Sequence, residues 1–150
     1  MTLPRLLATW FGAGLLPRAP GTWGSIAALP FAWVILWAGG WPALLVASVL
    51  VFFIGWWAAQ KLVDETGLAD PQLVVIDEVA GQWLVLLPAG LHWWSFLLAL
   101  ILFRIADIKK PWPANWADSQ VPGGLGVMLD DVFAALYGLV VMLIVHHFVG

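Results

Sequence analysis

Cysteine is absent from the 150 residues, and charged side chains make up only 10% of them. Without thiols the chain can form neither disulfides nor thiolate metal sites. A soluble domain carries about 25% charged residues, so this chain lacks the polar surface that would keep it soluble as a monomer. Its net charge of −3 is small and does not indicate a nucleic-acid partner.

Apolar residues dominate instead. They account for 63% of the chain, and the mean hydropathy is +0.95. This composition predicts a protein surrounded by lipid, with residues 1–150 forming one membrane-embedded domain. Long apolar stretches run from Ser25 to Ala38, Ala43 to Ala59, Val79 to Phe103 and Val132 to Val149.

Two interruptions of the apolar pattern predict helical hairpins. Gly39-Gly40-Trp41-Pro42 separates the first two stretches and has the chemistry of a tight turn. The stretch from Val79 to Phe103 is broken near its middle by proline and glycine. It is therefore either one kinked span or two short helices, Val79 to Leu87 and Trp93 to Ile105.

The placement of charge favours the two short helices. Every Lys, Arg, Asp and Glu lies in one of three stretches, Met1–Thr22, Gln60–Glu78 and Arg104–Asp131. A hairpin puts all three on one side of the membrane, whereas a single span divides them between two sides. Basic residues concentrate on the cytoplasmic side, so all six are predicted to be cytoplasmic.

The expected fold is therefore all-α, a small polytopic membrane bundle with a short helical hairpin. The first apolar run, Leu3 to Leu16, is too short to cross a bilayer, and it predicts an interfacial or re-entrant helix on the charged side. The three histidines, His92, His146 and His147, fall on the opposite side in this topology.

A glycine-rich motif on the charged side, "LLPRAPGTWGS", precedes the first span. Gly21 and Gly24 expose backbone N–H groups, and Thr22 and Ser25 add hydroxyl donors at a helix N-terminus, where anions bind well. Taken alone, the motif is more often a Pro/Gly turn with a capping hydroxyl.

Two adjacent carboxylates, Asp77 and Glu78, stand at the start of the third apolar stretch. Asp77 could cap a helix that begins at Val79. That leaves Glu78 unexplained, because two adjacent anions at a bilayer boundary repel each other and resist desolvation. A divalent cation makes such a pair tolerable, and oxygen ligands suit Mg²⁺.

The third motif is "FRIADIKKPWPANWADSQVPGGLGVMLDD". Arg104 and Asp107 are three residues apart and project from one helix face, and Lys110 follows that face. A glycine-rich loop then leads to Asp130 and Asp131 at the expected start of the last span. The alternative is unconnected roles: headgroup-binding cations, one ion pair and a capping aspartate.

The shared location of these motifs indicates one composite site. The carboxylates need a cation, and Arg104 and Lys110 need an anion. A magnesium-bound phosphate satisfies both, and phosphoryl chemistry depends mainly on positioning and charge stabilisation. At a membrane surface the available phosphate is a lipid headgroup, so the residues predict a metal-dependent enzyme acting on a phospholipid.

The chain resembles the phosphatidylglycerophosphatase A family of bacterial membrane lipid phosphatases. The resemblance rests on "GAGLLPRAPGTWGS", "VIDEVAG", "FRIADIKKPWPANWAD" and "GGLGVMLDD", which occur in this order along nearly the whole chain. It implies an all-α fold and Mg²⁺-dependent removal of the terminal phosphate from phosphatidylglycerophosphate. It also implies a multi-pass protein of the inner membrane whose site faces the cytoplasm.

Carried onto this sequence, the resemblance implies a site of eleven residues. Its metal ligands would be Asp77, Glu78, Asp107, Asp130 and Asp131. Its catalytic residues would be Asp77, Asp107, Asp130, Arg104 and Lys110. Its phosphate-binding residues would be Gly21, Thr22, Gly24, Ser25, Arg104 and Lys110.

Some alternatives stay open at this level. Either a carboxylate or a water activated by the metal could attack phosphorus, and the absence of a D-x-D-x-T sequence favours water, with Asp130 or Asp77 as base. Another lipid phosphate, phosphatidic acid or a polyprenyl phosphate, could be the substrate. Outside enzymes, the rival is a small divalent-cation transporter, which would need carboxylates within its spans.

Overall fold

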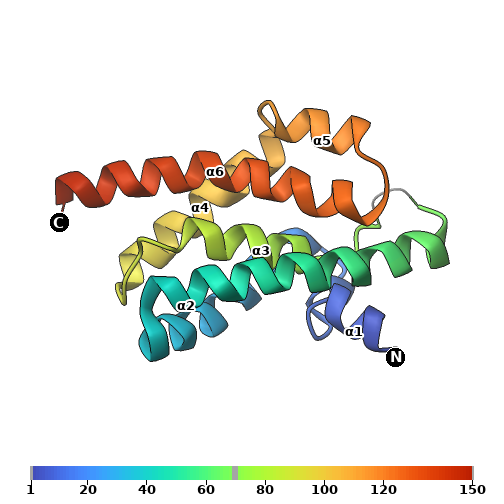
Figure 1. Cartoon of the computed structure of the whole chain (residues 1–150), viewed down its shortest axis with the longest axis horizontal. Coiled ribbons are helices and arrows are strands. Elements are labelled where there is room, and N and C mark those ends of the chain that lie inside the picture. Colours follow the sequence, from blue (N-terminus) through green and yellow to red (C-terminus); the bar gives the residue numbers. More distant parts are fainter. Residues whose placement is uncertain (1, 69–70, 150) are drawn as a thin grey trace.

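The computed structural model describes residues 2–68 and 71–149, and these contain helices but no β-strand. The all-α prediction is confirmed. Asp70, which belongs to the second charged stretch, lies outside the described residues. In chain order (Figure 1) the elements are α1 (Leu3–Ala8), the 3₁₀ turn η1 (Ala13–Leu15), α2 (Pro20–Thr66), α3 (Ile76–Val85), α4 (Trp93–Lys109), α5 (Ala114–Gln120) and α6 (Gly123–Val149).

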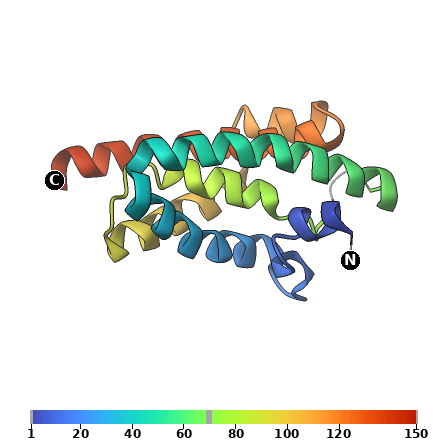
Figure 2. The ribbon, with the colours of Figure 1, turned by 60° about the horizontal axis from the view of Figure 1, so that its bottom comes forward.

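Helix α2 folds back on itself at the predicted break. Gly40 has φ 70° and ψ −165°, a conformation outside the helical region that glycine adopts readily. Pro42 follows two residues later and disfavours the helical conformation of the residue before it. The two halves of α2 therefore run in opposite directions, as Figure 2 shows.

The third apolar stretch forms the hairpin rather than one kinked span. Helix α3 has 10 residues, a rise of about 15 Å, or half the hydrocarbon core of a bilayer. Gly90 lies in the turn with φ 63°, and α4 brings the chain back toward the starting end (Figure 1). Both helices extend further at their charged ends than predicted. Helix α3 begins at Ile76 instead of Val79, and α4 continues to Lys109 instead of ending at Ile105.

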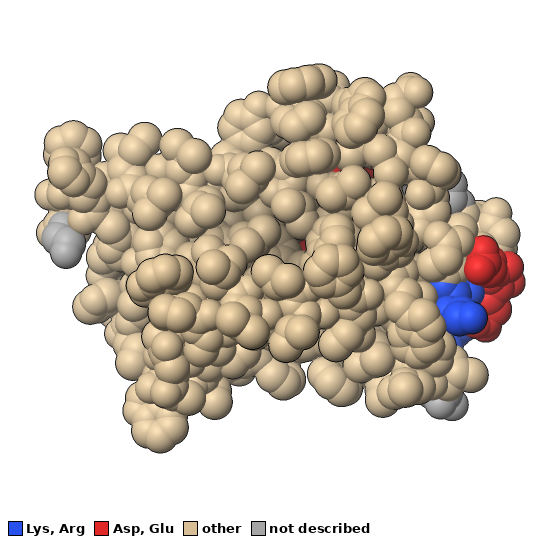
Figure 3. Space-filling model, in the orientation of Figure 1, with Lys and Arg blue, Asp and Glu red and all other residues tan. Residues whose placement is uncertain are grey.

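The described residues place the chain's charged segments at one end of the molecule. Helix α1, the end of α2, the start of α3, α5 and the start of α6 share that end, and the opposite end holds the two hairpin turns and the end of α6 (Figure 1). The face drawn in Figure 3 is almost wholly uncharged except at that first end. Two helices, α2 and α6, are long and apolar enough to cross a membrane.

Two segments differ from the sequence-based expectation. The N-terminal helix is only six residues long, because the chain turns at Thr9 and continues through η1. The glycine-rich segment Pro122–Gly126 was expected to be a loop, yet α6 begins at Gly123, and α5, which was not predicted, precedes it. The last helix therefore starts nine residues before Val132.

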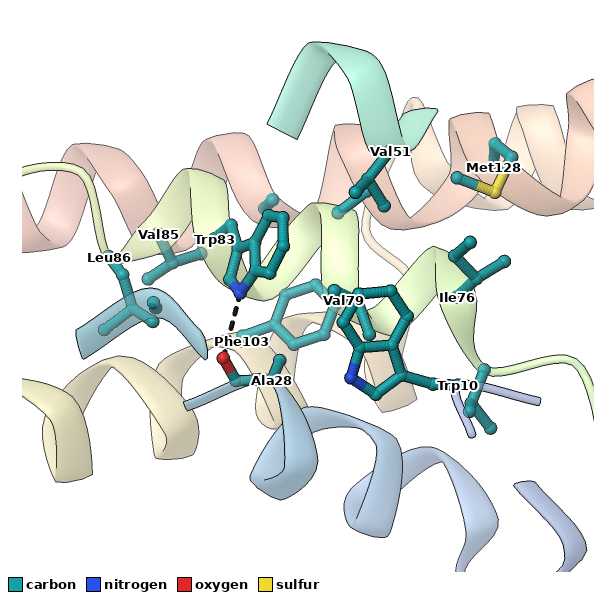
Figure 4. Close-up of a cluster of buried hydrophobic side chains, with 14 of the residues drawn as sticks. Trp10, Ala28, Val51, Ile76, Val79, Trp83, Val85, Leu86, Phe103 and Met128 are labelled. Carbon is teal, nitrogen blue, oxygen red and sulfur yellow. Dashed lines mark hydrogen bonds between the residues drawn. The ribbon is translucent and has the colours of Figure 1, made fainter. Parts of the chain in front are cut away.

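Helix α3 lies at the centre of the bundle, and nine of its ten residues are buried. Small residues allow its close packing: a Cβ added at Gly81 would lie 2.5 Å from the ring of Phe103. The indole Nε1 of Trp83 donates a hydrogen bond to the carbonyl oxygen of Ala28 at 2.9 Å, joining α3 to α2 (Figure 4). These contacts hold the start of α3, where the two carboxylates stand, in one position.

Candidate functional site

Five buried carboxylates from three helices meet in one pocket of about 460 Å³. Two come from α3, one from α4 and two from α6, and two basic side chains line the same pocket. The structure thus brings together the second and third sequence motifs. The charged residues of the pocket are Asp77, Glu78, Arg104, Asp107, Lys110, Asp130 and Asp131.

Asp77 and Glu78 lie in the first turn of α3, and neither side chain caps the helix. The capping alternative for Asp77 is therefore wrong, since Val75 holds the cap position. Acidic residues in a first turn interact favourably with the helix dipole. Burial, together with the charge of Glu78, raises the pKa of Asp77 well above its ordinary value. Burial also raises the pKa of Glu78 to about 7.

Arg104 connects two of the three helices. Its guanidinium forms a hydrogen-bonded ion pair with Asp107, one turn along α4, as the three-residue spacing predicts. The same Nη1 atom lies 3.9 Å from Oε1 of Glu78 on α3. The guanidinium is thus held between two buried carboxylates, and its side chain is 17% exposed.

Lys110 occupies the cap position at the end of α4, with φ 47°. Its Nζ atom donates a hydrogen bond to Oδ2 of Asp130 at 2.8 Å and lies 4.0 Å from Oδ1 of Asp107. Burial lowers the pKa of Lys110, but the neighbouring carboxylates, Asp130 first, raise it by more, and the result is well above the ordinary value. Lys110 therefore stays cationic.

Asp130 and Asp131 lie two turns inside α6, not at its start as expected. The glycine-rich segment is helical because it packs against α2: a Cβ at Gly124 would lie 2.6 Å from the carbonyl oxygen of Trp56. Its N–H donates a hydrogen bond to Oε1 of Gln60 at 2.7 Å. The two aspartates therefore cap no helix end, and that alternative is wrong as well.

The donor set of the pocket fits a hard divalent cation. Buried oxygens without a hydrogen-bond partner among the described residues belong to four of the five acids: Asp77 Oδ1, Glu78 Oε2, Asp130 Oδ1 and Asp131 Oδ2. An unpaired buried carboxylate oxygen is costly. Cations such as Mg²⁺ take all-oxygen ligand sets of this kind.

The glycine-rich motif meets the pocket only in part. Gly21 lines it at the first turn of α2, and a Cβ there would come within 2.8 Å of Oε1 of Glu78. Gly24 instead packs on Val75, since a Cβ would lie 2.7 Å from its side chain. Thr22, Gly24 and Ser25 are not among the residues lining the pocket, and phosphate binding by them stays a prediction.

Other pocket residues had no signal in the sequence. Pro71 and Gln72 precede α3 and line the pocket, although nothing in their residue types indicated a role. Asp118 of α5 lies 3.9 Å from Nζ of Lys110, and its place beside the site depends on the unforeseen α5.

The histidines lie at the other end of the molecule, at the turn before α4 and near the end of α6 (Figure 1). His146 Nε2 and Ser95 Oγ are hydrogen-bonded at 2.7 Å, and Trp94 stacks on the same imidazole. These packing and hydrogen-bond contacts account for the presence of His146 at this position, and no catalytic role is needed to explain it.

We expect His92→Gln, and His146→Gln combined with His147→Gln, to leave the turnover rate within about threefold of the parent protein. Rates measured on purified, folded variants in detergent check this. A hundredfold loss in either variant would mean that a histidine reaches the acidic pocket.

The chain is similar to known lipid phosphatases. A family model described as Phosphatidylglycerophosphatase A matches residues 6–146. A phosphatidylglycerophosphatase A of Escherichia coli is 36% identical over 143 residues, which cover 95% of this chain and 83% of that protein. One from Haemophilus influenzae is 38% identical over 143 residues, covering 95% and 88%.

A third relative has a different name. A protein of Bacteroides thetaiotaomicron, provisionally named a phosphatidylinositol-3-phosphatase, is 40% identical over 161 residues, covering 99% of this chain and 96% of its own. No solved structure matches the chain.

Proposed function

Because the chain belongs to the phosphatidylglycerophosphatase A family and is a phosphoric monoester hydrolase, we propose that it removes the terminal phosphate of phosphatidylglycerophosphate. The products are phosphatidylglycerol and inorganic phosphate. One observation carries the proposal: five buried carboxylates face Arg104 and Lys110 in a single pocket. Such a pocket suits a phosphate together with a divalent cation.

Magnesium would be held by Asp77, Glu78, Asp107, Asp130 and Asp131, and it would supply charge neutralisation at phosphorus and activation of the attacking water. Arg104 and Lys110 bind the phosphate oxygens, since both are cationic donors at the pocket wall. Gly21, in the first turn of α2, lines the same pocket, and the N-terminus of a helix favours a bound anion.

Hydrolysis requires water to form a new O–P bond while the P–O ester bond to glycerol breaks. Asp130 or Asp77 accepts the proton that the water loses, and this proton is then given to the leaving alkoxide oxygen, which departs as the alcohol. Arg104 and Lys110 stabilise the charge that develops on the phosphoryl oxygens.

We place the protein in the bacterial inner membrane, as a multi-pass protein with this pocket at the cytoplasmic face. The length and apolar character of α2 and α6 support insertion. The arrangement of the charged segments at one end of the bundle supports a single charged face (Figure 1), and basic residues favour the cytoplasmic side.

The absence of cysteine makes this topology simple to test. Single-cysteine variants Gln72→Cys and Ser119→Cys, both at exposed positions, are expected to react with an impermeant thiol reagent from the same, cytoplasmic side. Leu91→Cys, in the turn before α4, serves as the matched control and is expected to react from the opposite side only. Labelling of Gln72→Cys and Ser119→Cys from different sides would contradict the topology and the composite site.

A second hollow gives the lipid a route to the pocket. It measures about 680 Å³, and it shares Pro17, Pro20, Pro71 and Gln72 with the acidic pocket. Its remaining lining among the described residues is uncharged and mainly apolar, with Leu15, Leu16, Leu68 and Leu73. We propose that the glycerol and acyl portions of the substrate lie here while the terminal phosphate occupies the acidic pocket.

Leu16→Asp is expected to raise KM for long-chain phosphatidylglycerophosphate about tenfold, because burying a leucine against an acyl chain is worth about 1.5 kcal/mol or more. The value of kcat, and the activity on a water-soluble glycerophosphate ester, should stay near the parent values. Leu3→Asp, an exposed position on α1 at the same charged end of the bundle, is the control. Equal effects of Leu16→Asp on both substrates would argue against this route.

The test of the function is phosphate release from defined lipids in mixed micelles, with Mg²⁺ and with EDTA. We expect release from phosphatidylglycerophosphate that depends on Mg²⁺. Phosphatidylinositol-3-phosphate is the second candidate, because of the Bacteroides thetaiotaomicron relative. Phosphatidic acid and a polyprenyl phosphate complete the panel, and a higher kcat/KM on any of these three would replace the proposed substrate.

The described residues argue against the alternative of a divalent-cation transporter. All buried acidic side chains among the described residues belong to the one cluster. A cation route across the bundle would need further buried ligands toward the opposite end.

A further inference from the structure

The acidic pocket contains two groups of metal-ligand geometry, not one. Asp77, Asp130 and Asp131 each place one carboxylate oxygen within 4.8 Å of the other two, and we name these three residues group A. Glu78, Asp107 and Asp131 do the same, and we name them group B. The two groups account for all five carboxylates, and Asp131 belongs to both.

We infer that the pocket binds two divalent cations side by side, one in each group, with Asp131 contributing to both. This inference rests on the proposed magnesium-dependent function. Two-metal sites are common in enzymes that cleave phosphate esters, and their ions are about 3.5–4 Å apart, so one carboxylate can serve both.

The charge of the pocket favours two cations over one. Among the described residues that line the pocket, five carboxylates face two basic side chains, Arg104 and Lys110, and a phosphate monoester brings nearly two more negative charges. With a single divalent cation the loaded pocket would carry about three uncompensated negative charges, and with two it would carry about one. A buried site tolerates the second arrangement far better.

The two groups differ in how free their oxygens are. Every member of group A has a buried carboxylate oxygen without a partner among the described residues. In group B, Arg104 forms an ion pair with Asp107 and lies 3.9 Å from Glu78. Lys110 donates a hydrogen bond to Oδ2 of Asp130 in group A, but Oδ1 of the same carboxylate has no partner among the described residues. Asp107 in group B has no such oxygen, so a cation there competes with the guanidinium. We expect group A to bind the more tightly.

The test is the number of Mn²⁺ ions bound by the purified protein in detergent with inorganic phosphate present, because the charge balance above applies to the pocket that holds a phosphate. Equilibrium dialysis with metal analysis gives the count, and electron paramagnetic resonance reports whether two ions are close enough for spin coupling. The intact protein is expected to bind two ions with unequal Kd values and to show the coupled signal. Asp130→Asn and Glu78→Gln should each reduce the count to one and abolish the coupling.

Two further variants sharpen the result. Asp131→Asn should weaken both sites by about tenfold or more, because a ligand of each is lost. Arg104→Gln should keep two ions and tighten the weaker one. Asp118→Asn is the matched control, an acid 3.9 Å from Lys110 that belongs to neither group, and it should bind like the parent.

The outcomes separate the two proposals. A single Mn²⁺ per intact chain, with activity still dependent on Mg²⁺, would overturn the two-cation inference and leave the proposed function standing. Absence of any Mn²⁺ or Mg²⁺ binding would overturn the metal requirement itself. Since the decisive count uses the parent protein, poor folding of a variant cannot obscure it.

Discussion

Asp77→Asn is expected to lower the phosphatase rate by at least about a thousandfold, because it would remove one ligand of the proposed cation, whose charge would stabilise the transition state. The carboxylate is buried in the first turn of α3, beside Glu78, and one of its oxygens has no partner among the described residues. Glu78→Gln, Asp107→Asn and Asp131→Asn should have similar effects. Phosphate release at saturating Mg²⁺ measures the loss.

Stability distinguishes a functional role of Asp77 from a structural one. Asparagine at this position removes charge repulsion, so in EDTA the variant should unfold at the same temperature as the parent or above it. We expect Mg²⁺ to raise the Tm of the parent and to raise that of the variant by less. Glu65→Gln is the control, since Glu65 forms only an exposed ion pair with Arg5. Near-normal turnover in all four pocket variants would show that the metal site has been misplaced.

Arg104→Lys is expected to reduce kcat/KM by about a hundredfold, although the charge is kept. The planar guanidinium forms an ion pair with Asp107, approaches Glu78 and lies against Gly21, whose added Cβ would come within 3.2 Å of both its terminal nitrogens. A lysine ammonium offers a single point of contact and cannot match this geometry.

Steady-state kinetics on phosphatidylglycerophosphate measure this effect, with Arg5→Lys as the matched control. Arg5 pairs with Glu65 at 3.5 Å in a partly exposed position, where an ion pair is worth at most about 1 kcal/mol. Arg5→Lys should therefore leave kcat/KM unchanged. If Arg104→Lys stays within about fivefold of the parent, Arg104 is not the phosphate ligand.

Some features of the fold and of the site could be predicted from the sequence because they depend only on residues close together in the chain. The spacing of Arg104 and Asp107 predicted a shared helix face, and the ion pair between them follows from that spacing alone. The residues of Gly39–Pro42 predicted a reversal, and Gly40 provides it with a positive φ. Both features require only neighbours within a few residues.

Other features depend on partners distant in sequence. The start of α6 was placed at Val132 because a Gly-Gly segment is a poor helix former. In the structure, Gly124 is helical because only glycine lets α6 approach the backbone of α2 at Trp56. No local pattern contains that contact. The same error put Asp130 and Asp131 at a helix end, when they lie two turns inside.

By itself, the sequence determined the all-α class, the hairpins and the confinement of charge to three stretches. These features follow from the length of the apolar stretches and from the positions of glycine, proline and charged residues, which decide locally what enters a bilayer and what stays in water. Only the tertiary structure decided which carboxylates lie close enough together to share a cation. Asp77 and Glu78 are adjacent in the chain, yet they fall into different ligand groups, since successive residues of a helix point about 100° apart. Asp131 joins those groups because α6 packs against α3, and a contact between residues more than fifty positions apart is set by packing rather than by pattern.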